Sequence, residues 1–149
     1  MKPEDFIKKV KTFSKDEQLM KSMSMTAAML CCSDGELDQE EVKKVRELGK
    51  KFFKEKFDVN HFEELLSGSD ILAHTFNSGR GIKLIDTISS IYKNHSNLPK
   101  NEKLQIYSFF SEIALTDGEI HPNELMFLNK IAENLKIENP FNFSEILKN

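Results

Sequence analysis

Apolar residues recur every three or four positions along most of the chain, which is the spacing of a helix with one buried face. Such stripes fall in residues 14–33, 38–53, 61–66, 69–78, 82–92, 99–114 and 122–135. No segment alternates apolar and polar residues with the period of two that a half-buried strand requires. The pattern predicts an all-α protein of about seven helices. Short helical pieces are also expected near Pro3 and in residues 141–149.

Residues that start and stop helices stand at the ends of these stripes. Ser14 and Asp38 are expected N-caps, each followed by a glutamate three residues later. Pro122 is expected at the first position of a helix, where its missing N–H does no harm. Gly35 and Gly118 follow aspartates at the ends of two long stripes and are expected to terminate those helices. In the stripe of residues 82–92, Ile82, Ile85 and Ile88 are expected to share a buried face.

One octapeptide pattern occurs twice, as DGELDQEE in residues 34–41 and as DGEIHPNE in residues 117–124. Each copy lies between a long apolar helix and an amphipathic helix. We interpret this as an internal duplication, with one repeat at about 14–67, a second at about 97–149 and connecting helices at about 69–94. The chain 1–149 is then a single domain with pseudo-two-fold symmetry.

The repeated turns resemble the second half of a calcium-binding EF-hand loop, in which a glycine, an apolar residue and a glutamate keep a fixed spacing. The positions that would supply the first two ligands are apolar or cysteine, so an ordinary EF-hand is excluded. If the two turns lie side by side, however, Asp34, Glu41, Asp117 and Glu124 converge. Four neighbouring carboxylates repel one another, and a bound divalent cation relieves the repulsion. Oxygen ligands favour Ca²⁺, Mg²⁺ or Mn²⁺.

A second interpretation gives these acids a local role only. Aspartate before glycine is common turn chemistry, and glutamate in the first turn of a helix interacts favourably with the helix dipole. The protein is then a structural domain that binds a protein partner, with caps worth roughly 1 kcal/mol each.

Composition and charge reduce the number of function classes to consider. A net charge of −3 over 149 residues argues against nucleic acid as a partner. No stretch approaches the roughly 18 apolar residues that span a bilayer, and the N-terminus lacks the apolar run of a signal peptide. Cys31 and Cys32 are adjacent, which suits two free thiols in a cytoplasmic protein. No nucleophile–base pair or cofactor motif is present, so we expect a protein that is not an enzyme.

The two turns, their order and the interruption at Gly79 and Gly81 resemble the TerB-like family of tellurite-resistance and stress-associated proteins. The resemblance extends from about residue 16 to residue 143, and also reaches the N-terminal domain of a membrane-linked J-domain co-chaperone. It implies an all-helical fold with pseudo-two-fold symmetry, a protein partner in a stress response, and an acidic cluster that binds a divalent metal. Matched by motif, that cluster is Asp34, Glu41, Asp117 and Glu124. The methionine-rich helix and the cysteine pair have no counterpart in the pattern, and we expect them to be core residues.

Overall fold

The computed structural model describes residue 8 and residues 13–116, 118–138 and 140. Within them the regular structure is helical throughout, with no strand. The order is α2 (Lys15–Cys32), α3 (Gln39–Phe53), the short 3-10 helix η1 (Lys54–Lys56), α4 (Val59–Leu66), α5 (Ser69–Asn77), α6 (Gly81–Ser89), the 3-10 helix η2 (Ser90–His95), α7 (Lys100–Ala114) and α8 (Pro122–Leu135). The predicted all-α class is confirmed. The helical pieces expected near Pro3 and in residues 141–149 lie outside the described residues.

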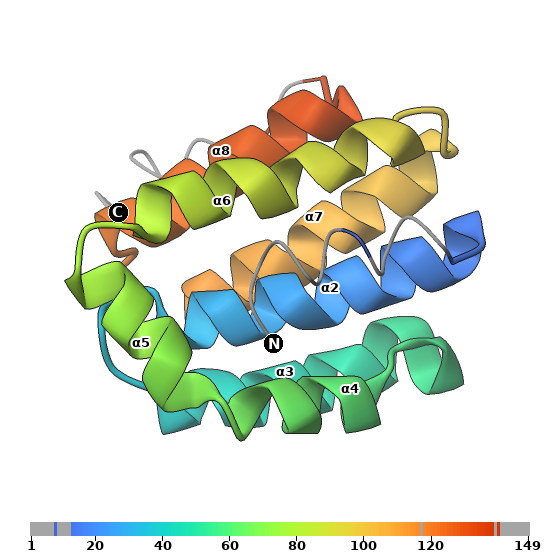
Figure 1. The fold of residues 1–149 in the computed structure, drawn as a ribbon. Helices are drawn as coiled ribbons and strands as arrows, with labels where there is room; N and C mark the ends of the chain where they lie inside the picture. Colours follow the sequence, from blue (N-terminus) through green and yellow to red (C-terminus); the bar gives the residue numbers. More distant parts are fainter. Residues whose placement is uncertain (1–7, 9–12, 117, 139, 141–149) are drawn as a thin grey trace.

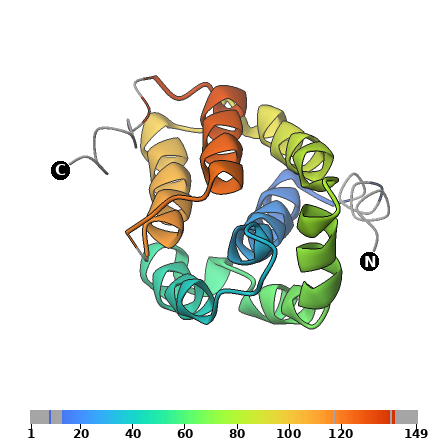
Figure 2. The same ribbon diagram turned by 90° about the vertical axis from the view of Figure 1, so that its left-hand side faces the viewer.

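Helix α2 is the centre of the molecule, with the other helices arranged around it (Figures 1 and 2). Every residue from Ser22 to Cys32 is buried, which leaves that half of the helix without a polar face. Met23, Met25 and Met29 lie in the core, as predicted. Because burying an unpaired polar group is costly, the hydroxyl groups of Ser24 and Thr26 make hydrogen bonds, whereas the Ser22 hydroxyl has no hydrogen-bond partner among the described residues. Thr26 Oγ1, for example, lies 2.7 Å from the hydroxyl of Tyr92.

Aromatic packing joins α3 and η1 to α7. The ring of Phe109 meets the rings of Phe53 and Phe57 edge-on, with centroids 5.2 and 5.3 Å apart. Such edge-to-face pairs add about 0.5–1.5 kcal/mol each beyond their buried area. The side-chain amide of Gln105 on α7 also donates to the Phe52 carbonyl at 2.8 Å. These contacts fix the C-terminal end of α3.

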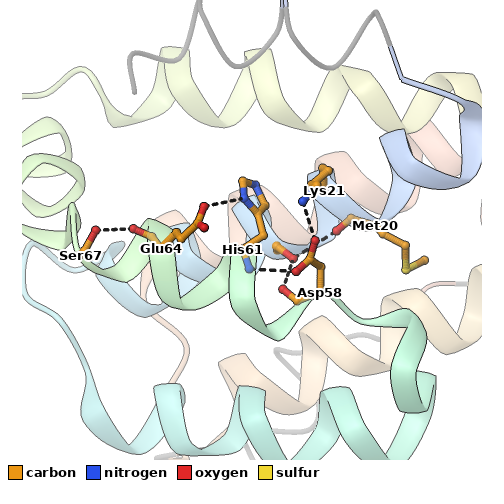
Figure 3. A network of polar contacts seen from close by, with 7 residues as sticks. Met20, Lys21, Asp58, His61, Glu64 and Ser67 are labelled. Atoms are coloured by element: carbon orange, nitrogen blue, oxygen red, sulfur yellow. Dashed lines mark hydrogen bonds and ion pairs between the residues drawn. The ribbon is translucent and has the colours of Figure 1, made fainter.

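Asp58 attaches α4 to the central helix (Figure 3). Its carboxylate caps α4 by accepting from the His61 backbone N–H at 2.9 Å and also accepts from Lys21 Nζ of α2 at 2.5 Å. The Ser24 hydroxyl of α2 donates to the Asp58 carbonyl at 3.1 Å. Burial favours the neutral acid, but the bonds from Lys21 and His61 outweigh it and lower the pKa of Asp58. One side chain thus starts α4 and places it.

The expected buried face of residues 82–92 needs one correction. Ile85 and Ile88 are fully buried, but Ile82 is 51% exposed. At 100° per residue, Leu84, Ile85 and Ile88 define the face that packs inward, and Ile82 falls roughly 60° beyond its edge. The stripe is also divided between α6 and the 3-10 helix η2, so it is shorter as an α-helix than predicted. No described helix combines the length and apolar character needed to cross a membrane.

Candidate metal-binding site

The two Asp-Gly connections lie at the same end of the molecule. The C-terminal ends of α2 and α7 and the N-terminal ends of α3 and α8 all reach the left side of Figure 1, which faces the viewer in Figure 2. A hydrogen bond across 90 residues of sequence confirms the proximity, since Asn123 Nδ2 of α8 donates to the Ser33 carbonyl at 2.9 Å. Ser33 is the C-cap of α2. The condition on which the shared site depends, that the two turns lie close together, therefore holds for their described residues.

The first turn is held by short-range bonds and by one distant side chain. Gly35 has a φ of +94°, a conformation that favours glycine. Its N–H donates to the Cys32 carbonyl at 3.0 Å, and Asp34 Oδ1 accepts from the Glu36 N–H at 3.0 Å. The amide of Asn77, at the end of α5, donates to the Gly35 carbonyl at 3.0 Å. Asp34 itself is exposed to solvent.

The N-terminus of α3 is anchored to the same end of α2. The Asp38 N–H donates to the Cys31 carbonyl at 2.8 Å, and its side chain caps α3 by accepting from the N–H groups of Glu40 and Glu41. The predicted cap is confirmed. The result is that Glu41, in the first turn of α3, has a fixed position relative to the end of α2.

The second turn ends in a capping box at the start of α8. His121 is the N-cap, and its Nδ1 accepts from the Asn123 N–H at 3.1 Å. In return, the His121 N–H donates to Glu124 Oε1 at 3.1 Å. Gly118 has a φ of +81°, and its N–H donates to the Leu115 carbonyl at 3.0 Å. Asp117 lies outside the described residues.

Glu41 and Glu124 meet in the space between the two turns. Each is only 5% exposed, which is unusual for glutamate, and their carboxyl groups lie within hydrogen-bonding distance of each other. Burial, followed by the contact with Glu124, raises the pKa of Glu41 to about 11, with a smaller contribution from Asp38. At neutral pH the cation-free pair therefore holds a proton between two carboxyl groups.

This pair fits a hard cation better than a soft one. Glu41 Oε2 is buried and receives no hydrogen bond from an N–H or hydroxyl donor of the described residues, so a cation could bind this oxygen without displacing such a donor. The neighbouring Cys31 thiol is a poor ligand, because burial, followed by Glu41, raises its pKa well above 9. Oxygen donors without thiolate favour Mg²⁺, Ca²⁺ or Mn²⁺.

The predicted ligand set is brought together only in part. Glu41 and Glu124 are adjacent, Asp34 is exposed on its turn, and Asp117 lies outside the described residues. Among the residues that the structure does describe, no group of three or more histidine, cysteine, aspartate or glutamate side chains is placed to hold a metal ion.

Two asparagines of this site have no recognisable signal in the sequence. Asn77 lies in neither repeated turn, and Asn123 lies within the second octapeptide but matches no cap or ligand spacing. Their acceptors are backbone carbonyls of the first turn, 42 and 90 residues away. Only folding brings donor and acceptor together.

The fold and this site define a small all-helical protein in which a pair of carboxyl groups from the starts of α3 and α8 is buried at one end of a helical bundle. The family model described as "Tellurite resistance protein TerB" matches residues 33–141, and the chain belongs to this family. The resemblance to the TerB-like family noted from the sequence is confirmed. No curated protein and no solved structure matches the chain.

Proposed function

We propose that this protein is a non-enzymatic, cytoplasmic stress-response module that binds a divalent metal cation. Its ligands are Glu41 and Glu124, joined by Asp34 and Asp117 of the two Asp-Gly turns. The observation that carries the proposal is the burial of Glu41 against Glu124, two carboxyl groups from distant parts of the sequence. Membership of the TerB family supports the association with tellurite resistance.

The physical reason is the free energy of the buried pair. Two carboxyl groups in contact cannot both ionise without strong repulsion, and burial increases that repulsion. A divalent cation replaces the shared proton, neutralises both charges and satisfies the buried oxygen of Glu41. The bonds from Asn77, Asn123 and Asp38 hold the site without occupying the two carboxyl groups.

A structural interaction domain is the second candidate, and a groove beside α2 favours it. The groove has a volume of about 1000 Å³ and lies between the start of α2, η1 and the start of α7. Its lining includes the partly buried rings of Phe52 and Phe53. The lining also includes charged residues such as Glu17, Lys56 and Glu102, and a groove with apolar and charged parts suits an amphipathic helix of a partner protein. In this case the Glu41–Glu124 pair is a proton-sharing contact that joins α3 to α8.

Calorimetric titration of the chelator-treated protein with Ca²⁺, Mg²⁺ and Mn²⁺ separates the two candidates. The metal-binding proposal predicts saturable heat and a rise in melting temperature with cation concentration, because a ligand of the folded state stabilises it. Glu41→Gln is expected to abolish both, and the double variant Asp34→Asn, Asp117→Asn to weaken binding. The matched control is Glu47→Gln, an exposed glutamate of the same helix. Absence of heat, or equal heat from wild type and Glu41→Gln, refutes metal binding at this site.

A further inference from the structure

A short series of hydrogen bonds links the starts of α3 and α8, which carry the two buried carboxyl groups, to the end of α2. Glu41 is placed by the bond from the Asp38 N–H to the Cys31 carbonyl. Glu124 is adjacent to Asn123, whose side chain donates to the carbonyl of Ser33. Cys31 and Ser33 belong to the same helix end, so α2 is the common reference for both glutamates.

The Asn123 bond is the part of this series that crosses between the two turns. It is 2.9 Å long, and its acceptor belongs to a residue that is only 2% exposed. The side-chain amide of Asn123 donates to the Ser33 carbonyl, and its backbone N–H donates to His121 Nδ1. The effect of Asn123 on the two carboxyl groups is therefore indirect. Its bond holds the N-terminal end of α8, and with it Glu124, against the Asp34-Gly35 turn.

We propose that Asn123 is a positioning residue that sets the affinity of the cation site by fixing Glu124 relative to Glu41. The inference rests on the proposed function of the carboxyl pair and adds a residue that is not itself a ligand. Ligands held in advance in their binding arrangement lose less free energy to reorganisation when the cation binds. Loss of an outer partner of this kind commonly weakens metal binding by about 10–100-fold.

The same helix supplies a matched control. Asn134, near the C-terminal end of α8, donates its Nδ2 to the carbonyl of Ser89 at 2.8 Å. Both asparagines thus make the same bond from the same helix, to carbonyls of serines that are each at most 2% exposed. Asn134 belongs to the last turn of the helix, whereas Asn123 belongs to the first. The two alanine variants remove equivalent bonds, but only one of those bonds lies beside the site.

The experiment compares Asn123→Ala with Asn134→Ala in the full chain. Circular dichroism first establishes that both are folded and lose comparable melting temperature. Calorimetry with Mn²⁺ and with Ca²⁺ then measures the dissociation constants. Asn123→Ala is expected to raise them by about tenfold or more, and Asn134→Ala to leave them unchanged. If Asn123→Ala does not fold, Asn123→Gln, which keeps the amide but changes its reach, replaces it under the same criterion.

Amide hydrogen exchange of the cation-free protein supplies a second readout. Asn123→Ala is expected to accelerate exchange of the Gly35 and Glu36 N–H groups, and Asn134→Ala to leave it unchanged. Equal effects of the two variants on cation affinity overturn the inference even if wild type binds the cation. Absence of binding by wild type overturns the proposed function itself. The exchange data then show whether Asn123 holds the turn in the absence of any cation.

Discussion

The buried Glu41–Glu124 pair makes a direct prediction about the dependence of stability on pH. The pKa of Glu41 is raised from about 4.5 to about 11 in the folded protein. Below the unfolded value, both states carry the proton and the pair has no effect on the pH dependence. As the pH rises above that value, the unfolded chain releases the proton while the folded protein retains it. The free energy of unfolding therefore falls with rising pH until the folded pKa is reached.

The magnitude follows from one retained proton. Each pH unit lowers the free energy of unfolding by about 1.4 kcal/mol, because that is the free energy of a tenfold change in proton activity. From about pH 7 to about pH 8.5 the loss is about 2 kcal/mol, and it belongs to the pair as a unit, since the two groups titrate together. This is a large fraction of the 5–15 kcal/mol that is typical of a folded domain.

Urea denaturation of the chelator-treated protein at several pH values measures this loss, with Glu41→Gln as the comparison. Glutamine has nearly the same shape, cannot ionise, and can donate a hydrogen bond to Glu124. Between about pH 7 and about pH 8.5, the free energy of unfolding of Glu41→Gln is expected to fall less steeply than that of wild type, by about 1.4 kcal/mol per pH unit. Measuring the difference between the two proteins cancels the contributions of other titrating groups. A saturating divalent cation is expected to remove or reverse the decline in wild type, because protons then compete with the bound cation.

Two results contradict this reasoning. Parallel stability curves for wild type and Glu41→Gln mean that Glu41 is ionised in the folded protein at neutral pH. If the stability of wild type instead rises with pH relative to that of Glu41→Gln, the folded protein stabilises the ionised form of Glu41, as it would for a carboxylate with a cationic partner.

Three further predictions concern the elements around the site. Gly35→Ala places its Cβ about 2.1 Å from Asn77 Oδ1 at a positive φ, whereas Gly118→Ala has open space at a similar φ. Urea denaturation should show that the free energy of unfolding falls by about 2–3 kcal/mol in Gly35→Ala and by about 1–2 kcal/mol in Gly118→Ala. Equal losses would mean that the contact with Asn77 contributes nothing. His95 is buried, and desolvation lowers its pKa. Below about pH 6.5 the unfolded chain therefore takes up a proton more readily than the folded protein, so the melting temperature of wild type should fall with pH and that of His95→Gln should fall less. Identical melting profiles would contradict this prediction. Asp58→Ala should lower the free energy of unfolding by about 1–2 kcal/mol more than Asp58→Asn, which keeps a capping oxygen. Equal losses would assign the effect to the ion pair with Lys21, which both variants lose.

Much of the local structure follows directly from short stretches of sequence. Helix caps act within a turn of the chain, so Asp38 and Pro122 indicate where α3 and α8 begin, and Gly35 indicates where the chain leaves α2. The buried methionines of α2 also follow from the local pattern. The internal duplication and its symmetry stay a prediction from the repeated octapeptide.

The sequence offered two meanings for Glu41 and Glu124, as helix-start acids and as members of a shared site, and could not choose between them. The structure shows a local role for Glu124 and also a contact between the two glutamates. Glu124 does belong to a capping box, through the His121 N–H, and it also lies against Glu41. The repeated spacing identifies the two residues, but the contact between them depends on how α3 and α8 pack at the end of α2.

By itself, then, the sequence determined the helices, their ends and the acids that deserve testing, because those depend on interactions between residues a few positions apart. Only the tertiary structure decided that Glu41 is buried against Glu124, that Asn123 reaches Ser33, and that Ile82 faces solvent. Burial and the resulting change in the pKa of Glu41 depend on what surrounds a side chain in space. Those surroundings come from helices that are distant along the chain.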